Sequence, residues 1–242
     1  MSGRRARLTA MFVGVSVVVC FGSDARGQAR PNSALANWGQ PIDPSRDCWT
    51  RLVGETLAID VPGSTHDLRG DGEVNAPRVV RSIDGDFIAQ VKVSGNLRHT
   101  GKRTSGLSVA YHGAGLLIWQ NARNYVRLER SGLVREDGQT VHFANFELHR
   151  DGQVVVKALE IPDQDTYLRL ERRGNRVFGL VTGDGYKWSS LEPIAARLPR
   201  DVKLGVVAIS TSTEPLKVVF SDLEVLKREA NEPRKTVPAA GR

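Results

Sequence analysis

The sequence predicts an all-β protein, a sandwich of two antiparallel sheets built from about a dozen strands. Three observations predict this class. Strand-type runs with period-2 alternation recur at short spacing, glycine-bearing turns separate them, and helical periodicity is almost absent. Because an antiparallel sheet commonly hides one face and shows the other, the alternation also indicates which side chains should point outward.

The first 29 residues match the pattern of a signal peptide. Three arginines precede an apolar run, Leu8–Gly22, that is too short to span a bilayer comfortably, and Gly27 and Ala29 then supply the small residues that a signal peptidase reads. We therefore expect residues 1–29 to be removed. The mature protein is then secreted or periplasmic, with no membrane attachment after cleavage.

The basic charge of the chain is concentrated at its two ends. The chain has a net charge of +7, of which residues 1–29 supply +3 and residues 227–242 another +3, so that residues 30–226 carry only +1. A nucleic-acid-binding protein needs a concentrated basic face that displaces counterions from phosphates. The charge distribution therefore excludes nucleic acid as the main partner, and the charged, apolar-poor tail at 227–242 is expected to be disordered.

The mature chain begins with a segment that has little strand character. Residues 30–48 contain three prolines and are expected to form an irregular lead-in, with Trp38 and Trp49 anchoring it against the sandwich. Cys48, the one cysteine left after cleavage, is expected to be buried as a small hydrophobe rather than to act as a nucleophile. The sandwich itself is expected to span residues 49–226.

The first strands alternate with polar loops. Ser64–Asn75 and Asn96–Thr104 are polar and are expected to be loops. The expected strands around them are Glu55–Val61, a short strand that opens at Ala76, Asp86–Val93 and Gly106–His112.

A central hairpin, Ala114–Arg130, follows, in which Leu116–Gln120 and Tyr125–Arg130 flank a short polar link. Asp151-Gly152 is the strongest hairpin signal because this pair suits a two-residue type I′ turn. The later expected strands are Val141–Arg150, Gln153–Leu159, Tyr167–Arg172, Val177–Thr182, Val202–Ser210 and Leu216–Leu226. Pro193–Arg197 is the only modest helix candidate.

One motif of the central hairpin returns later in the chain with the same alternation. The first row is Tyr125, Arg127 and Glu129, and the second row is Tyr167, Arg169 and Glu171. Leu128 and Leu170 lie between the members of these rows and belong inside, so both rows are expected to point outward. The sequence thus predicts two strands that present the same aromatic, cation and anion on a surface that the protein uses.

Several runs of the chain together resemble a known family. They are AGLLIWQNARNYVRLER, TYLRLERRGNRVFGLVTGDGYKW, VKLGVVAIS and VVFSDLEV. In this order they resemble the family of unknown function that includes a regulator of enolase, within the concanavalin A-like lectin/glucanase superfamily, and they are similar to the C-terminal domain of some β-xylosidases. The resemblance covers about Trp49 to Leu226. It implies a jelly-roll sandwich with a concave sheet, and it brings no established catalytic residues.

Carbohydrate binding without cleavage is the function that these residues favour. Sugars stack their apolar ring faces on aromatic side chains, and their hydroxyls pair with carboxylates and guanidinium groups. The expected ligand-binding residues are Trp119, Tyr125, Arg127, Glu129, Tyr167, Arg169, Glu171, Asp184 and Trp188. The competing interpretation is an ordinary solvated sheet with cross-strand ion pairs. A core position would also explain Trp119, which shares a face with Leu117.

Two other function classes stay open. A glycoside hydrolase needs two carboxyl groups about 5–10 Å apart, one of them protonated, and Glu129 and Glu171 would form this pair if their strands lie close together. An arginine on the same face, two residues from each, is expected to keep both carboxyl groups ionised. The third class is a structural or protein-interaction module that uses a sheet face or edge.

Metal ligands do not stand out in the sequence. The five histidines, His66, His99, His112, His142 and His149, show no paired ligand spacing. Acidic loop residues such as Asp71 and Asp84 would suit calcium, but no fixed spacing supports a calcium site. We therefore expect no metal and no cofactor, and the oligomeric state stays open.

Overall fold

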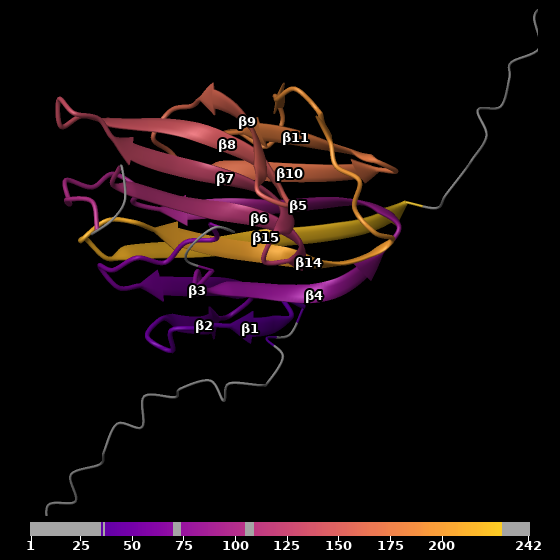
Figure 1. Cartoon of the computed structure of the whole chain (residues 1–242), viewed down its shortest axis with the longest axis horizontal. Helices are drawn as coiled ribbons and strands as arrows, with labels where there is room; N and C mark the ends of the chain where they lie inside the picture. Colours follow the sequence, from indigo (N-terminus) through magenta and orange to yellow (C-terminus); the bar gives the residue numbers. More distant parts are fainter. Residues whose placement is uncertain (1–34, 36, 70–73, 105–108, 229–242) are drawn as a thin grey trace, which may run out of the picture.

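In the computed structural model the strand runs pair into two antiparallel sheets that lie against each other (Figure 1). The structure describes Leu35 and residues 37–69, 74–104 and 109–228. These residues form fifteen strands and no helix, which confirms the predicted all-β sandwich. The expected signal peptide, part of the expected strand at Gly106–His112 and most of the expected tail lie outside the described residues.

The first sheet, called sheet I, has seven strands. Their order across the sheet is β1 (Gln40–Ile42), β4 (Arg78–Asp84), β14 (Asp201–Ser210), β6 (Tyr111–Asn121), β7 (Asn124–Val134), β8 (Thr140–Arg150) and β9 (Gln153–Glu160). β1 lies in the segment that was expected to be an irregular lead-in, and it pairs with the N-terminal part of β4.

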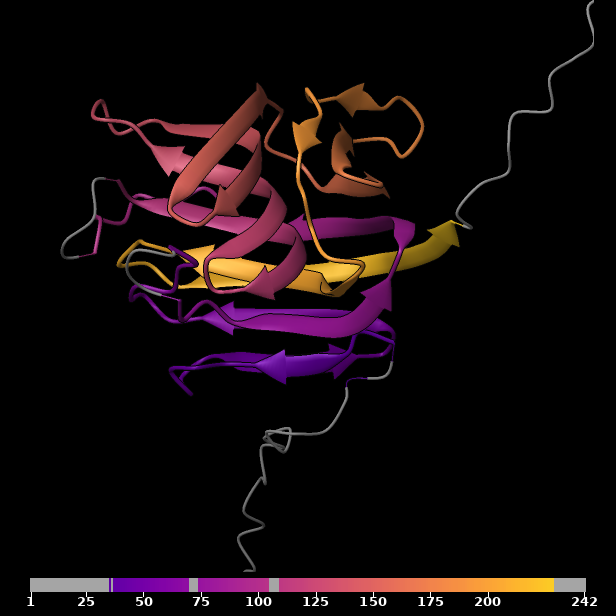
Figure 2. The same cartoon turned by 45° about the vertical axis from the view of Figure 1, so that its right-hand side comes forward.

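The second sheet, called sheet II, has eight strands. Their order is β12 (Ser189–Ser190), β11 (Arg176–Thr182), β10 (Thr166–Arg173), β5 (Asp86–Gly95), β15 (Leu216–Arg228), β3 (Thr56–Val61) and β2 (Trp49–Val53), and β13 (Ile194–Ala195) also pairs with β11. Figure 2, turned by 45°, separates the two sheets at the top of the view, where β8 and β9 lie to the left and β11 to the right.

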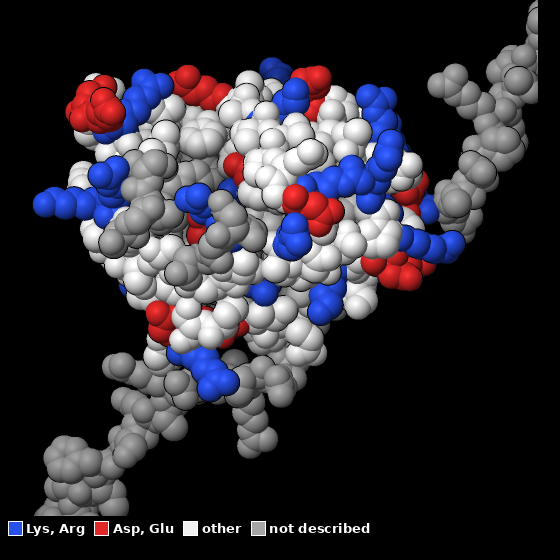
Figure 3. All heavy atoms as spheres, viewed as in Figure 1, with Lys and Arg blue, Asp and Glu red and all other residues white. Residues whose placement is uncertain are grey.

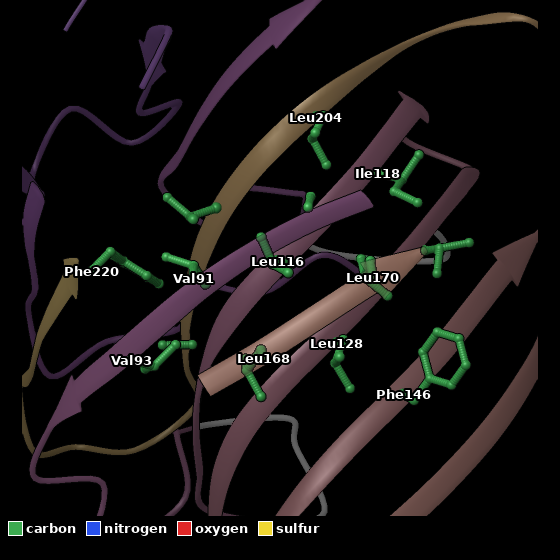
Figure 4. Packing of buried hydrophobic residues seen from close by; sticks show 14 of the residues in the cluster. Val91, Val93, Leu116, Ile118, Leu128, Phe146, Leu168, Leu170, Leu204 and Phe220 are labelled. Carbon is green, nitrogen blue, oxygen red and sulfur yellow. The ribbon is translucent and has the colours of Figure 1, made fainter. Parts of the chain in front are cut away.

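The main hydrophobic core fills the space between the sheets. Alternate residues of each strand point into it, as period-2 patterning requires. Leu116, Leu128 and Phe146 of sheet I face Val91 and Leu168 of sheet II, and all are fully buried (Figure 4). The inward assignment of Leu128 and Leu170 is therefore confirmed.

Two local predictions had different outcomes. Asp151 and Gly152 both have positive φ, of 46° and 89°, as a type I′ hairpin turn requires. The helix expected at Pro193–Arg197 was wrong, because Ile194 pairs with Val177 of β11 as part of a short strand. Ile194 and Ala196 are both buried with an exposed residue between them, which is strand alternation rather than a helical stripe.

The N-terminal anchor was correct for one tryptophan only. Trp38 is buried, packs beside Phe220, and donates its indole N–H to the carbonyl of Glu55. Trp49 lies on the edge strand β2 and is exposed. Cys48 is half-buried against the core and has a free thiol.

A second apolar layer covers the outward face of sheet I, and it decides what that face can do. The loop between β3 and β4, called the covering loop (residues 62–69 and 74–77), lies back on the sheet. It is attached by reciprocal backbone hydrogen bonds between His66 and Ser210. Leu68 of this loop is fully buried against Leu117 and Tyr125.

Among the described residues no helix is long and apolar enough to cross a membrane.

Candidate functional site

The first row lies on β7 at the centre of sheet I and points away from the main core, as predicted. Its expected exposure was wrong. Tyr125 and Glu129 are fully buried and Arg127 is only 7% exposed. The reason is the covering loop, a polar segment by sequence, which packs Leu68 on the sheet and accepts a hydrogen bond from the Tyr125 hydroxyl at the Leu68 carbonyl.

Three rings form a stack across neighbouring strands on this face. Tyr125 is the register partner of Trp119 on β6 and of His149 on β8. Its ring stacks on both, with centroids 5.6 Å from Trp119 and 4.4 Å from His149. The guanidinium of Arg78 lies 4.5 Å from the Trp119 ring centroid. Trp119, which the sequence predicts as a ligand-binding residue, is therefore mostly a packing residue, with 8% of its surface exposed.

Next to this stack lies a buried polar cluster, called the Arg127 cluster. It consists of Tyr111, Arg127, Glu129, Asn145, Glu147 and His149. Arg127 donates through Nε to Glu147 Oε2 at 2.9 Å, and its Nη2 lies 2.8 Å from the same oxygen. The same Nε lies 3.4 Å from Glu129 Oε2, and Nη1 lies 3.7 Å from Asp67 of the covering loop. One guanidinium therefore faces three carboxyl groups.

The pKa values of the two glutamates of the cluster are shifted in opposite directions. Burial raises the pKa of Glu129 to about 7, and Arg127 offsets this only in part. Burial alone would also raise the pKa of Glu147, but Arg127 and the hydrogen bonds from His149 and Asn145 outweigh it and lower the pKa to about 2. Arg127 therefore does not hold the pKa of Glu129 in its ordinary range, contrary to what the sequence led us to expect, because desolvation is the larger effect there.

A glycine makes room for the tyrosine of the cluster. A Cβ atom on Gly113 would lie 2.6 Å from the Tyr111 hydroxyl oxygen, so the Tyr111 ring rests where a side chain would otherwise stand. From there the hydroxyl donates to Glu129 Oε2 at 2.9 Å and lies 2.7 Å from Ser131 Oγ. Within the described residues Glu129 Oε1 and Arg127 Nη1 have no hydrogen-bond partner. The cluster thus retains unused hydrogen-bonding capacity in a buried position.

The second row lies on β10 of sheet II, and it differs from the first in its surroundings. Tyr167 and Arg169 are half-exposed. Arg169 donates two hydrogen bonds to Gln90 Oε1, and its guanidinium lies 3.9 Å from the ring centroid of Trp188. Tyr167 donates to Asp222, which a β-bulge in β15 presents toward it. Glu171 points outward as predicted, but Arg173 pairs with it and leaves it only 7% exposed.

Asp184 organises the turn that carries the neighbouring aromatic residues. Its Oδ1 accepts hydrogen bonds from the backbone N–H groups of Tyr186 and Lys187 and from the Thr182 hydroxyl, each at 2.8 Å. Bonds from the Lys187 and Tyr186 amides and from Thr182 lower the pKa of Asp184 to about 2. The carboxylate expected to bind ligand is thus already engaged in holding the turn, whereas Tyr186 is 88% exposed.

The two rows do not form one surface. β7 belongs to sheet I and β10 to sheet II, and each row points away from the core between the sheets. The prediction that both rows belong to one surface was wrong, because two strands with the same pattern joined different sheets. For the same reason Glu129 and Glu171 cannot flank one glycosidic bond.

An accessible hollow among the described residues lies at one end of sheet I. It has a volume of about 520 Å³ and is lined by Ser82, Ile83, Asp84, Trp119, Gln120, Asp201, Val202 and Lys203. We call it the Trp119 groove. Register places Ser82 and Trp119 on either side of Lys203 across β4, β14 and β6. Ser82, Gln120 and Lys203 are exposed, and within the described residues their side chains have no hydrogen bond or ion pair.

Sequence reasoning missed most of this arrangement. Asn145, Glu147 and His149 alternate along the predicted strand Val141–Arg150, so their common face was readable from the sequence. The signal for the groove was weaker, since its lining comes from three strands that only the sheet order brings together. Figure 3 shows that blue and red side chains are interspersed on the face in view, so that this face carries no field of one sign.

The fold and these sites define the class of the protein, a jelly-roll β-sandwich whose outward sheet faces carry polar side chains. The chain belongs to DUF1349, a family of proteins of unknown function, whose profile matches residues 47–228. A search of curated proteins finds no match.

Solved structures confirm the fold. A functionally unknown protein from Saccharomyces cerevisiae superposes with a TM-score of 0.64 at 14% identity, covering 80% of this chain and 98% of that one. The GH43 protein BlXynB from Bacillus licheniformis, in its K247S mutant, gives a TM-score of 0.56 at 12% identity, covering 72% of this chain and 33% of the longer chain. The similarity to BlXynB therefore concerns one part of a larger protein.

Proposed function

We propose that this protein is an exported, non-catalytic carbohydrate-binding β-sandwich and that it binds a glycan in the Trp119 groove. The observation that carries the proposal is the groove itself. Its volume of about 520 Å³ falls within the roughly 300–1,000 Å³ typical of small-ligand sites. Its exposed hydroxyl, amide and ammonium groups on Ser82, Gln120 and Lys203 are not engaged with other side chains of the described structure.

The chemistry of the lining suits a sugar. Hydroxyl groups both donate and accept, so a polyol is recognised by a lining that mixes donors and acceptors. Lys203 supplies donors, Asp201 supplies acceptors, and Ser82 and Gln120 supply both. Ile83 and Val202 add apolar contact beside them. The exposed edge of Trp119, rather than a ring face, meets the ligand.

Rigidity of the groove supports binding as well. Trp119 is held by the Tyr125 stack and by Arg78, and Tyr125 is held by the covering loop. A preorganised site loses little conformational entropy when its ligand binds. The Arg127 cluster contributes to the rigidity of the groove because it packs beside the ring stack. It does not contact the ligand in the binding mode that we propose.

A glycan array followed by calorimetry tests the proposal. The double variant Gln120→Ala/Lys203→Ala removes two exposed lining groups whose side chains have no hydrogen bond or ion pair within the described residues, so it should fold normally and bind the selected glycan at least tenfold more weakly. The matched control is Tyr167→Ala/Trp188→Ala on sheet II, which should bind as the unaltered protein does. Full binding by the groove variant would refute the proposed site.

Glycoside hydrolysis is the second candidate function, favoured by one observation in the Arg127 cluster. Glu129 has a pKa raised by burial to about 7 and Glu147 a pKa lowered to about 2, which is the division between a protonated acid and an ionised partner. Glu129 and Glu147 thus take the place of the carboxyl pair suggested by the sequence, Glu129 and Glu171. Glu129 is fully buried, so a substrate would reach it only after the covering loop moved, and this makes the candidate the weaker one.

Reducing-sugar release distinguishes the two candidates. The binding proposal expects no release above background from any glycan that the array selects. Release that Glu129→Gln and Glu147→Gln each abolish, in variants shown to be folded by circular dichroism, would establish the hydrolase instead.

A further inference from the structure

We propose that Asp47, Cys48 and His66 form a binding site for a divalent transition-metal ion of the zinc type. The three residues come from two segments that are apart in the sequence, the entry to β2 and the covering loop. Their ligand atoms, a carboxylate oxygen, the Sγ atom and an imidazole nitrogen, all lie within 4.8 Å of one another. No spacing rule predicts the group, because the fold rather than a local motif brings His66 to the pair.

The separations fit one ion. Ligands about 2.0–2.3 Å from a tetrahedral zinc ion lie roughly 3.3–3.8 Å from one another. Cys48 Sγ lies 3.6 Å from Asp47 Oδ1, which is within this range. His66 Nε2 lies 2.8 Å from the same oxygen, so a small rotation of the exposed Asp47 side chain is needed to admit the ion.

The orientation of His66 is that of a metal ligand. Its Nδ1 lies 3.1 Å from the carbonyl oxygen of Ser64, an acceptor that this nitrogen meets when it carries the ring proton, and 3.5 Å from Ser64 Oγ. Metal-binding histidines commonly donate their second ring N–H in this way, which fixes the ring with the other nitrogen toward the ion. Nε2 faces Asp47 Oδ1 at 2.8 Å, toward the other two ligand atoms.

The surrounding backbone holds the ligands in place. Asp43 accepts hydrogen bonds from the backbone N–H groups of Cys48, at 2.9 Å, and Arg46, at 3.0 Å. His66 is fixed by its reciprocal backbone bonds to Ser210. Both segments that supply ligands are thus attached independently of any ion, so the site is preorganised.

The donor set selects the metal class. Thiolate and imidazole ligands favour zinc and its neighbours over calcium and magnesium, which prefer oxygen alone. Three protein ligands leave a fourth position, and the Asp47 side chain is 45% exposed, so that position faces solvent. Binding converts the Cys48 thiol to a thiolate and releases its proton to solvent.

Cobalt titration of the full-length protein tests the site directly, because Co²⁺ substitutes for zinc and gives a thiolate-to-cobalt charge-transfer band in the near ultraviolet. We expect the band in the unaltered protein and in Cys20→Ser, which removes the other cysteine of the chain. We expect no band in Cys48→Ser. Addition of Zn²⁺ should abolish the band in the unaltered protein.

Two further variants separate ligation from folding. Asp47→Asn alters an exposed side chain and should fold, and we expect it to weaken cobalt binding at least tenfold. His149→Gln is the matched control. His149 also lies 2.8 Å from a carboxylate oxygen, that of Glu147, but it does not belong to the group of Asp47, Cys48 and His66. The His149→Gln variant should therefore bind cobalt normally. Absence of a band in Cys20→Ser, or an equal affinity in Asp47→Asn and the unaltered protein, would overturn the proposal.

Discussion

The two Tyr-x-Arg-x-Glu rows carry the same side chains on strands of the same kind, yet they lie in opposite environments. On β7 the tyrosine, arginine and glutamate are buried beneath the covering loop, and Arg127 faces three carboxyl groups. On β10 the tyrosine and arginine are half-exposed, and Arg169 contacts a neutral amide and an indole ring.

The difference teaches that alternation specifies which face a residue occupies but not what covers that face. Both rows point away from the core, as the pattern requires. Within the described residues the covering loop, which is polar by composition, packs on the first row and not on the second. A buried ion pair and an exposed one have very different energetics, so the same motif packs in a buried cluster on sheet I and forms a half-exposed surface on sheet II.

Replacement of the arginine gives the largest expected contrast between the rows. Arg127→Ala leaves Glu147 ionised and buried without its cation, and loss of one partner of a buried pair costs about 3–5 kcal/mol. Arg169→Ala removes half-exposed contacts and should cost about 1 kcal/mol or less. Urea unfolding measures both. Equal losses in the two variants would mean that the rows do not differ in burial.

Replacement of the tyrosine should again destabilise the protein more in the first row than in the second, with a somewhat smaller difference in unfolding free energy. Tyr125→Ala empties a fully buried ring site between Trp119 and His149, and truncation of a buried aromatic costs about 3–4 kcal/mol. Tyr167→Ala loses a hydrogen bond to Asp222 at the surface and should cost about 1 kcal/mol. Thermal unfolding followed by circular dichroism compares them, and the account fails if Tyr167→Ala is the more damaging.

The glutamate of the first row predicts a pH dependence. Burial raises the pKa of Glu129 from 4.5 to about 7, so the native protein holds this proton more tightly than the unfolded chain. The resulting stability is fully present below pH 4.5 and is lost as the pH rises through 7. The loss is on the order of 3 kcal/mol.

Glu129→Gln removes this titration. Relative to the unaltered protein, the variant should therefore be more stable at pH 8 than at pH 5, as measured by chemical denaturation at both values. Glu171→Gln in the second row controls for the loss of a carboxylate as such. If the stability difference between Glu129→Gln and the unaltered protein is the same at both pH values, the buried, protonated state of Glu129 is wrong.

The smallest effect is expected at Trp188. Its ring stacks under the guanidinium of Arg169, and an exposed cation–π contact contributes about 0.5–1 kcal/mol. Trp188→Ala should therefore lower the free energy of unfolding by no more than about 1 kcal/mol, while Trp188→Phe should retain part of the contact. A loss above 3 kcal/mol would show that this part of sheet II is core.

The fold was predictable from the sequence because the period-2 alternation of apolar and polar residues can be recognised within each strand separately. The runs around Leu128 and Leu170, the turn at Asp151-Gly152 and the closing strand at Leu216 all depend on neighbours in sequence, and all were confirmed. The candidate site was predictable only in part. Which sheet a strand joins depends on pairing over long sequence distances, so the pattern could not separate β7 from β10.

The missing information at Glu129 was of a different kind. The sequence indicates Arg127 on the same face but not the depth of burial, and at Glu129 desolvation exceeds the attraction of the arginine. The same holds for Trp119, whose core position follows from contacts with Tyr125 and Arg78 that only the folded sheet supplies.

The central claim is that a ligand binds at the end of sheet I and not along the repeated rows. Backbone-amide NMR during titration with the glycan that the array selects tests it most directly. We predict that the amide signals of Ser82, Gln120 and Lys203 move in proportion to saturation while those of Arg169 and Trp188 stay in place. Shifts confined to β10 and the Asp184 turn would contradict the account.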